Sequence, residues 1–219
     1  MTTDEPRLQA ERVLVEGSFE AANDYFHEKQ WTDGLPIVPP TPERVRAMLA
    51  AIGRDPQEVV ARIPPFWADA TLEKIAINAV MAGCRPEFLP VVVAALEALG
   101  DPSFNLYGVQ ATTHSAAPLI IVNGPAVERL GINGDANAFG QGVRANATIG
   151  RAVRLVLINV GGGRPGSTDK STQGQPGKYA YCVAENEALS PWEPLHVERG
   201  YRREESAVTV VGAAAPQNI

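Results

Sequence analysis

The stretch IGRAVRLVLINV, residues 149–160, decides the fold more than any other part of the chain. Its apolar side chains recur with the i, i+3, i+4 spacing of a single helical face: Ile149, Ala152, Val153, Val156, Leu157 and Val160. Arg151 and Arg154 fall outside that set. Three glycines, residues 161–163, follow directly and end the helix. The segment therefore predicts a long amphipathic helix whose apolar face packs on a core.

Proline-led start signals predict two helices nearer the N-terminus. Thr41-Pro42-Glu43 combines a capping hydroxyl, a proline suited to the first helical position and a carboxylate suited to the helix dipole. A helix should run from there to about residue 52, before Gly53. Asp55-Pro56 repeats the pattern and predicts a shorter helix through about residue 62.

Two longer apolar segments predict buried helices in the middle of the chain. Residues 71–82 place their apolar side chains on one face, and Gly83 suits a left-handed terminator. Residues 88–99 follow Pro86 and are apolar nearly all round, which indicates a helix buried between layers.

The apolar period then changes to that of strands. Residues 105–113, 119–122, 178–183 and 207–211 are predicted strands, with a short helix at residues 126–130. Helices and short apolar strands interleave without a strict βαβ alternation. We therefore predict the α/β class, with a mixed sheet in a single domain of two or three layers.

Composition limits the partners and the location. At 219 residues and 45% hydrophobic content, one domain is expected, residues 19–219, opening with a helix at 19–30 and preceded by a flexible arm, residues 1–18. A net charge of −6 and a pI near 5.2 would repel nucleic acids and anionic membranes, so we expect neither as a partner. Without a leader or an apolar run of about 20 residues, the expected location is the cytoplasm.

Cys84 is the first candidate catalytic residue. It lies just before a predicted helix start and beside Arg85, two features that favour a thiolate. The alternative is that a lone cysteine between apolar helices is a small buried hydrophobe. No CxxC spacing links Cys84 to Cys182, so reduced thiols are expected.

His114 is the second candidate. It ends the predicted strand 105–113, and a strand tip in an α/β sheet commonly lines a crevice where an imidazole can act as a base. The alternative is a histidine bonded to a neighbouring loop carbonyl. His27 and His196 have weaker contexts and are not chosen.

Residues 123–146 form the densest polar stretch and suggest a binding shell. Its candidate substrate-binding side chains are Asn123, Asn133, Asn137, Arg144 and Asn146. Interspersed glycines would let backbone N–H groups approach a ligand, and Arg144 near a helix start suits an anion or a carboxylate. The alternative is that asparagine and glycine simply build turns.

A polar loop after residue 168 could close over a small substrate, followed by further candidates: Lys178, Tyr181, Cys182 and Glu185. The nearby Gly161-x-Gly163-x-x-Gly166 follows a predicted helix and contains Pro165, so it gives no support for a dinucleotide. Cys84, His114, Cys182 and Glu185 together would suit a transition metal, but their spacing is no metal signature. No metal ligands are assigned.

Three strings resemble one known family. They are WTDGLPIVPPTP at residues 31–42, NAVMAGCRPE at 78–87, and PGKY with CVAENE within 176–187. They resemble the bacterial UGSC-type (seleno)protein group, named for a Sec-Gly-Ser-Cys motif, and the resemblance covers most of residues 31–198. This chain has neither that motif nor a selenocysteine, so redox chemistry is not carried over. The resemblance implies that the segments around Cys84 and around residues 178–185 belong to one site.

The leading hypothesis is an enzyme that acts on a small polar or anionic metabolite through the Cys84 thiol, by redox or nucleophilic chemistry, with His114 as proton shuttle. The enzyme would then be an oxidoreductase or a lyase. One alternative is a metal-dependent lyase or hydrolase, and another is a non-catalytic subunit of a larger redox complex. The cofactor is unknown. The expected partners are a small-molecule substrate and further copies of the chain in a homo-oligomer, and a redox partner protein is also considered.

Overall fold

The fold centres on β3 (Ala117–Asn123) in the computed structural model, which describes residues 8–15 and 17–217. β3 pairs in parallel with β4 (Cys182–Ala184) and antiparallel with β5 (Ala207–Ala213), which gives the order β4-β3-β5. A separate antiparallel pair joins β1 (Val59–Ile63) to β2 (Ala68–Thr71). The larger sheet is mixed, so the predicted α/β class with a mixed sheet is confirmed.

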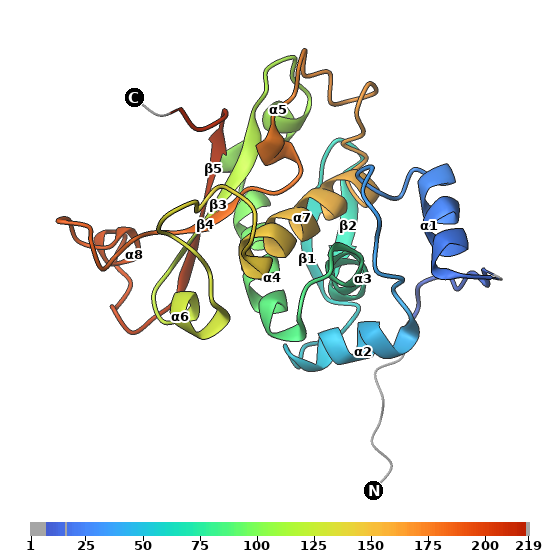
Figure 1. The fold of residues 1–219 in the computed structure, drawn as a ribbon, viewed down its shortest axis with the longest axis horizontal. Helices are drawn as coiled ribbons and strands as arrows, with labels where there is room; N and C mark the ends of the chain where they lie inside the picture. The colour runs from blue at the N-terminus through green and yellow to red at the C-terminus, as the bar shows by residue number, and fades with distance from the viewer. Residues whose placement is uncertain (1–7, 16, 218–219) are drawn as a thin grey trace, which may run out of the picture.

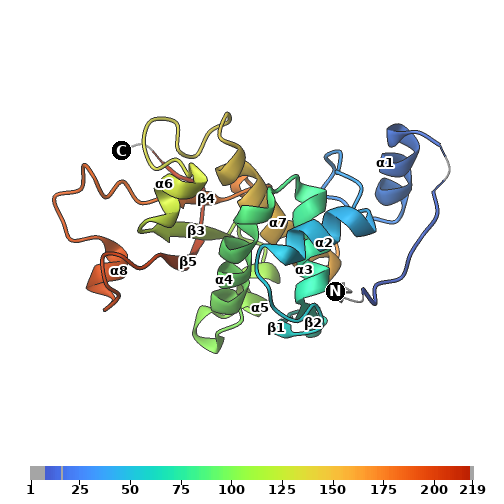
Figure 2. The ribbon, with the colours of Figure 1, turned by 90° about the horizontal axis from the view of Figure 1, so that it is seen from below.

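Three helices fill the middle of the molecule: α3 (Leu72–Ala82), α4 (Leu89–Leu99) and α7 (Arg144–Asn159). α7 packs on α3 and β4, while α4 packs on α7, β5 and β1. The three-stranded sheet and the β1–β2 pair lie on different sides of these helices (Figures 1 and 2). The shorter or peripheral helices are α1 (Phe19–Glu28), α2 (Pro42–Ala50), α5 (Leu106–Gln110), α6 (Ala126–Leu130), α8 (Leu195–Glu198) and the 3₁₀ turns Pro86–Phe88, Pro102–Phe104 and Pro176–Lys178.

The core helices begin and end where the sequence predicts. The Thr71 hydroxyl accepts a hydrogen bond from the Lys74 N–H, and Gly83 ends α3 with a φ of +87°, a left-handed conformation that favours glycine. The predicted apolar face of α7 is buried, as Ile149 and Val156 illustrate. α4 is also buried along most of its length, as its all-round apolar sequence indicates.

The predicted helix over residues 55–62 is wrong. The Gln57 N–H donates to the Asp55 carboxylate, so Asp55 makes a tight turn in place of a helix cap. The chain then extends into β1, whose β-branched residues favour a strand and whose backbone finds a partner in β2. Pairing within this hairpin overrides the helical start signal.

The predicted strand over residues 105–113 is also wrong. Asn105 adopts a left-handed φ of +53°, and its side chain accepts a hydrogen bond from the Gly108 N–H, which begins α5. Residues 111–116 form a loop before β3. The strand predicted at residues 178–183 is shorter than expected, because the 3₁₀ turn Pro176–Lys178 precedes β4.

The N-terminal arm predicted at residues 1–18 lies partly outside the described residues, which leave out 1–7 and 16. Where it is described, the backbone N–H groups of Gln9 and Ala10 donate to the buried Glu73 carboxylate at 2.9–3.0 Å. This part of the arm is therefore held against α3. Within residues 8–15 and 17–217, the helices are too short or too polar to span a membrane.

Candidate functional site

Cys84 lies in a buried environment at the joint after α3. It is only 8% exposed, and its thiol donates a hydrogen bond to the Thr148 carbonyl at 3.2 Å. Burial raises the pKa of Cys84 to about 12, an effect larger than the opposite influence of Arg144 and Arg151. Arg85 instead lies beside Glu87 at 3.8 Å. The alternative weighed from the sequence, a buried hydrophobic cysteine, fits these contacts better than a reactive thiolate.

Cys182 shares this character. It lies on β4 and is buried, and burial raises the pKa of its thiol, with Cys84 adding a smaller contribution in the same direction. Both cysteines are free thiols. Burial thus favours the protonated, less nucleophilic form of both thiols.

His114 does not lie at a strand tip, and that part of the prediction is wrong. It is exposed in the loop before β3, where its backbone N–H donates to the Thr112 hydroxyl at 3.0 Å. β3 begins after His114 and ends at Asn123. His114 and the polar stretch after Asn123 therefore lie at opposite ends of one strand.

The carboxyl ends of the two parallel strands bring other polar residues together. Val122 and Ala184 are partners in the sheet, so Asn123 and Glu185 are the next residues on neighbouring strands. The Asn123 amide nitrogen donates to Glu185 at 2.5 Å and to Glu187 at 2.9 Å. One fully buried amide thus holds two carboxylates within about two hydrogen-bond lengths of each other.

Further backbone donors fix the two carboxylates. The Gly124 N–H donates to the same Glu187 oxygen at 2.7 Å, and the Leu195 N–H donates to Glu185 at 2.9 Å. The other oxygen of each carboxylate accepts no hydrogen bond from the described residues. Each glutamate therefore keeps one oxygen for a ligand.

His196 completes this cluster from α8. It is 1% exposed, and neither ring nitrogen has a hydrogen-bond partner in the described part of the chain. Its Nδ1 lies 3.8 Å from the bonded Glu187 oxygen. Neither Glu187 nor His196 is among the candidates predicted from the sequence. The signal for Glu187 was Glu185-x-Glu187 directly after a buried strand.

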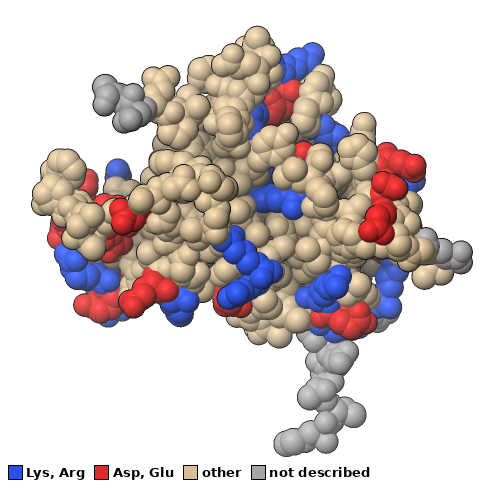
Figure 3. Space-filling model, in the orientation of Figure 1, with Lys and Arg blue, Asp and Glu red and all other residues tan. Residues whose placement is uncertain are grey.

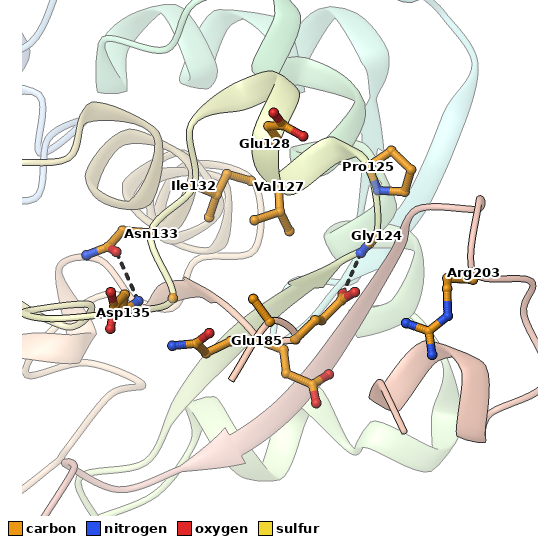
Figure 4. Close-up of a pocket in the computed structure, with 13 residues that line it drawn as sticks. Gly124, Pro125, Val127, Glu128, Ile132, Asn133, Asp135, Glu185 and Arg203 are labelled. Carbon is orange, nitrogen blue, oxygen red and sulfur yellow. Dashed lines mark hydrogen bonds between the residues drawn. The ribbon is translucent and has the colours of Figure 1, made fainter. Parts of the chain in front are cut away.

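A cleft of about 510 Å³ opens beside these carboxylates. Its charged lining residues are Glu128, Asp135, Glu185, Glu187 and Arg203, and the segments that form it are residues 124–135 and 185–188. Figure 4 shows Glu185 between Asn133 on one side and Arg203 on the other. The acidic excess favours a neutral or cationic ligand over an anion.

Among the predicted asparagines, only Asn133 lines this cleft. Asn146 is buried, and its amide bonds the Asn133 backbone N–H and C=O, each at 2.8 Å. Asn137 is exposed and donates to the Gln141 carbonyl at 2.9 Å. These contacts are those of turn-building asparagines, which was the alternative reading of the stretch.

The predicted basic and aromatic residues make contacts that hold the fold together outside the cleft. Arg144 donates twice to the Gly83 carbonyl and so ties α7 to α3. Lys178 pairs with Asp169 at 2.8 Å. The Tyr181 hydroxyl donates to the Ala214 carbonyl at 2.8 Å. None of the three lines the cleft.

No group of three or more His, Cys, Asp or Glu side chains in residues 8–15 and 17–217 has the arrangement of a metal site. Comparisons with protein-family models, with curated proteins and with solved structures find no match to this chain. The resemblance to the UGSC-type group stays a prediction.

Proposed function

We propose that the chain is an enzyme that removes a proton from a small polar molecule bound in the cleft, with Glu187 as the proton acceptor. One observation carries this proposal: the buried Asn123 amide holds Glu185 and Glu187 together at the carboxyl ends of two parallel strands. Ligands of open α/β sheets bind at that edge. The substrate class is a small neutral or cationic molecule.

The hydrogen bonds give Glu187 the geometry of a general base. Asn123 and the Gly124 N–H occupy one of its oxygens, so the carboxylate is oriented while the second oxygen stays free. The proton moves from the substrate to this free oxygen, and the electron pair stays on the substrate atom. Arg203 lines the same cleft and supplies the positive charge that would stabilise the resulting anion.

His196 serves as a positioning residue. Its buried ring lies behind the bonded oxygen of Glu187, with Nδ1 3.8 Å from that oxygen, and neither ring nitrogen has a hydrogen-bond partner in the described residues. A carboxylate backed by an imidazole is a common arrangement for moving protons. The thiols of Cys84 and Cys182 have no step in this proposal because burial keeps them protonated.

The test combines a binding screen with proton exchange. Neutral and cationic polar metabolites are screened by thermal shift, and the binders are incubated with the protein in D₂O and followed by NMR. The wild type should catalyse deuterium incorporation into a binder. Glu187→Gln should lower the exchange rate by about 100-fold or more. Glu28→Gln, which changes an exposed glutamate at the end of α1 outside the cleft, should leave it nearly unchanged.

Two outcomes would overturn the proposal. One is that no binder exchanges with solvent in the presence of the wild type. The other is that Glu187→Gln exchanges at the wild-type rate while its melting temperature shows that it is folded. Glu187→Asp provides a second variant, which keeps the carboxylate but retracts it, and its rate should fall between the two.

A further inference from the structure

α7 carries a second cluster of charges, away from the cleft. Arg151 pairs with both oxygens of Asp33 at 2.8 Å and also donates to the carbonyls of Leu35 and Pro36. On the loop that crosses α7, Lys178 pairs with both oxygens of Asp169, at 2.8 and 2.9 Å. The two carboxylates of this cluster are therefore occupied by two cations.

Arg154 is the third cation of the cluster and has no carboxylate partner of its own. It lies one turn after Arg151, is only 9% exposed, and its guanidinium makes no hydrogen bond or ion pair with the described residues. Asp169 and Asp33 act on it only through space. Three cations thus share two carboxylates, which leaves one buried positive charge uncompensated.

A buried guanidinium without a partner destabilises the fold unless another group supplies hydrogen-bond acceptors and negative charge. A guanidinium has five N–H donors, and burying them without acceptors disfavours the folded state. None of the Arg154 nitrogens is fully shielded from the surface, since none is among the fully buried polar atoms that lack a partner. Each of these nitrogens therefore keeps some accessible surface, although the residue as a whole is only 9% exposed. In Figure 3, Lys and Arg side chains lie in a hollow near the middle of the molecule, over α7.

The loop beside Arg154 shows the same shortage of acceptors. Arg164 Nε and Gln175 Nε2, both in the polar loop after α7, are buried without a hydrogen-bond partner in the described residues. Gly150, one turn before Arg154, has no room for a Cβ because the backbone of Ala180 and Tyr181 approaches it closely. α7 and the loop are thus packed together here, with unsatisfied donors and excess positive charge.

We propose that Arg154 anchors a binding site for a small oxyanion, a carboxylate or phosphate group, between α7, residues 31–36 and the loop of residues 161–181. The planar guanidinium fork fits two oxygens of such a group. The anion would supply the acceptors and the negative charge that the cluster lacks. This site is separate from the acidic cleft, whose charge favours the opposite kind of ligand.

The test uses inorganic phosphate, acetate and, at equal ionic strength, chloride. Phosphate or acetate should raise the melting temperature of the wild type in a saturable way, and chloride should not. Arg154→Gln should weaken the apparent affinity by about tenfold or more. Arg85→Gln, which changes an exposed arginine, is the matched control and should respond like the wild type.

A second readout separates a binding role from a structural one. If the Arg154 charge is uncompensated, Arg154→Met should melt at the same or a higher temperature than the wild type when no anion is added. If the arginine instead holds the fold together, Arg154→Met should melt at a lower temperature than the wild type. Equal stabilisation of Arg154→Gln and the wild type by the oxyanions, or no stabilisation of the wild type by either, would overturn the proposal. Glu187→Gln should keep the response, so this site and the proposed function fail independently.

Discussion

The thiol of Cys84 should resist alkylation in the folded protein. Its pKa is raised from 9.0 to about 12 by burial. At pH 8, about one thiol in ten is ionised when the pKa is 9.0, but only about one in ten thousand when the pKa is 12. Because the thiolate is the nucleophile, iodoacetamide should modify Cys84 about a thousand times more slowly in the folded chain than in the unfolded chain.

The assay is a time course of iodoacetamide labelling at pH 8, with and without urea, read by mass spectrometry of the peptide that contains Cys84. Ser167→Cys places a thiol at an exposed position and gives the reference rate for a reactive cysteine in the folded protein. A rate for Cys84 within about tenfold of that reference would refute the reasoning, because it would require a thiolate that the buried environment disfavours.

Three further predictions concern stability. Because burial raises the pKa of Cys84, the folded chain keeps a proton that the unfolded chain releases above pH 9. The free energy of unfolding should therefore fall as pH rises from 9 toward 12, by up to about 1.4 kcal/mol per pH unit. Urea titrations should show a smaller slope for Cys84→Ala. Asn123→Ala should cost about 3 kcal/mol in urea unfolding, since it removes the amide shared by two carboxylates, and a cost under about 1 kcal/mol would contradict that role. Gly124 and Gly131 both have positive φ, but only at Gly124 would an added Cβ meet the Glu205 carbonyl. Gly124→Ala should therefore cost about 2 kcal/mol more stability than Gly131→Ala. Equal losses in thermal unfolding would contradict the close approach at Gly124.

The sequence predicts the fold best where local pattern and tertiary packing agree. α3 with its Gly83 terminator, α4, α6 and α7 follow from apolar spacing and stop signals, because each buries the face that its sequence marks. β1 is missed because its partner strand, and not its own start signal, decides its conformation. α5 is missed because a side-chain cap from Asn105 begins it in a segment with strand-like composition.

The candidate site is only partly predictable for a similar reason. Asn123 and Glu185 are both candidates from the sequence, but their contact depends on the register of two strands about 60 residues apart. Cys84 has the local features of a reactive thiol, yet its reactivity depends on burial by α7, which no local pattern reveals. His114 is misplaced because its strand was misplaced.

Substrate binding beside the paired carboxylates can be observed in the amide spectrum of ¹⁵N-labelled protein titrated with the binder of largest thermal shift. The Gly124 backbone amide, which donates to Glu187, and the Asn123 side-chain amide, which bridges both glutamates, should shift in proportion to occupancy. The signals of Thr112 and Thr148, beside His114 and Cys84, should stay unchanged. Shifts around Thr148 with none at Gly124 would show that the substrate binds elsewhere.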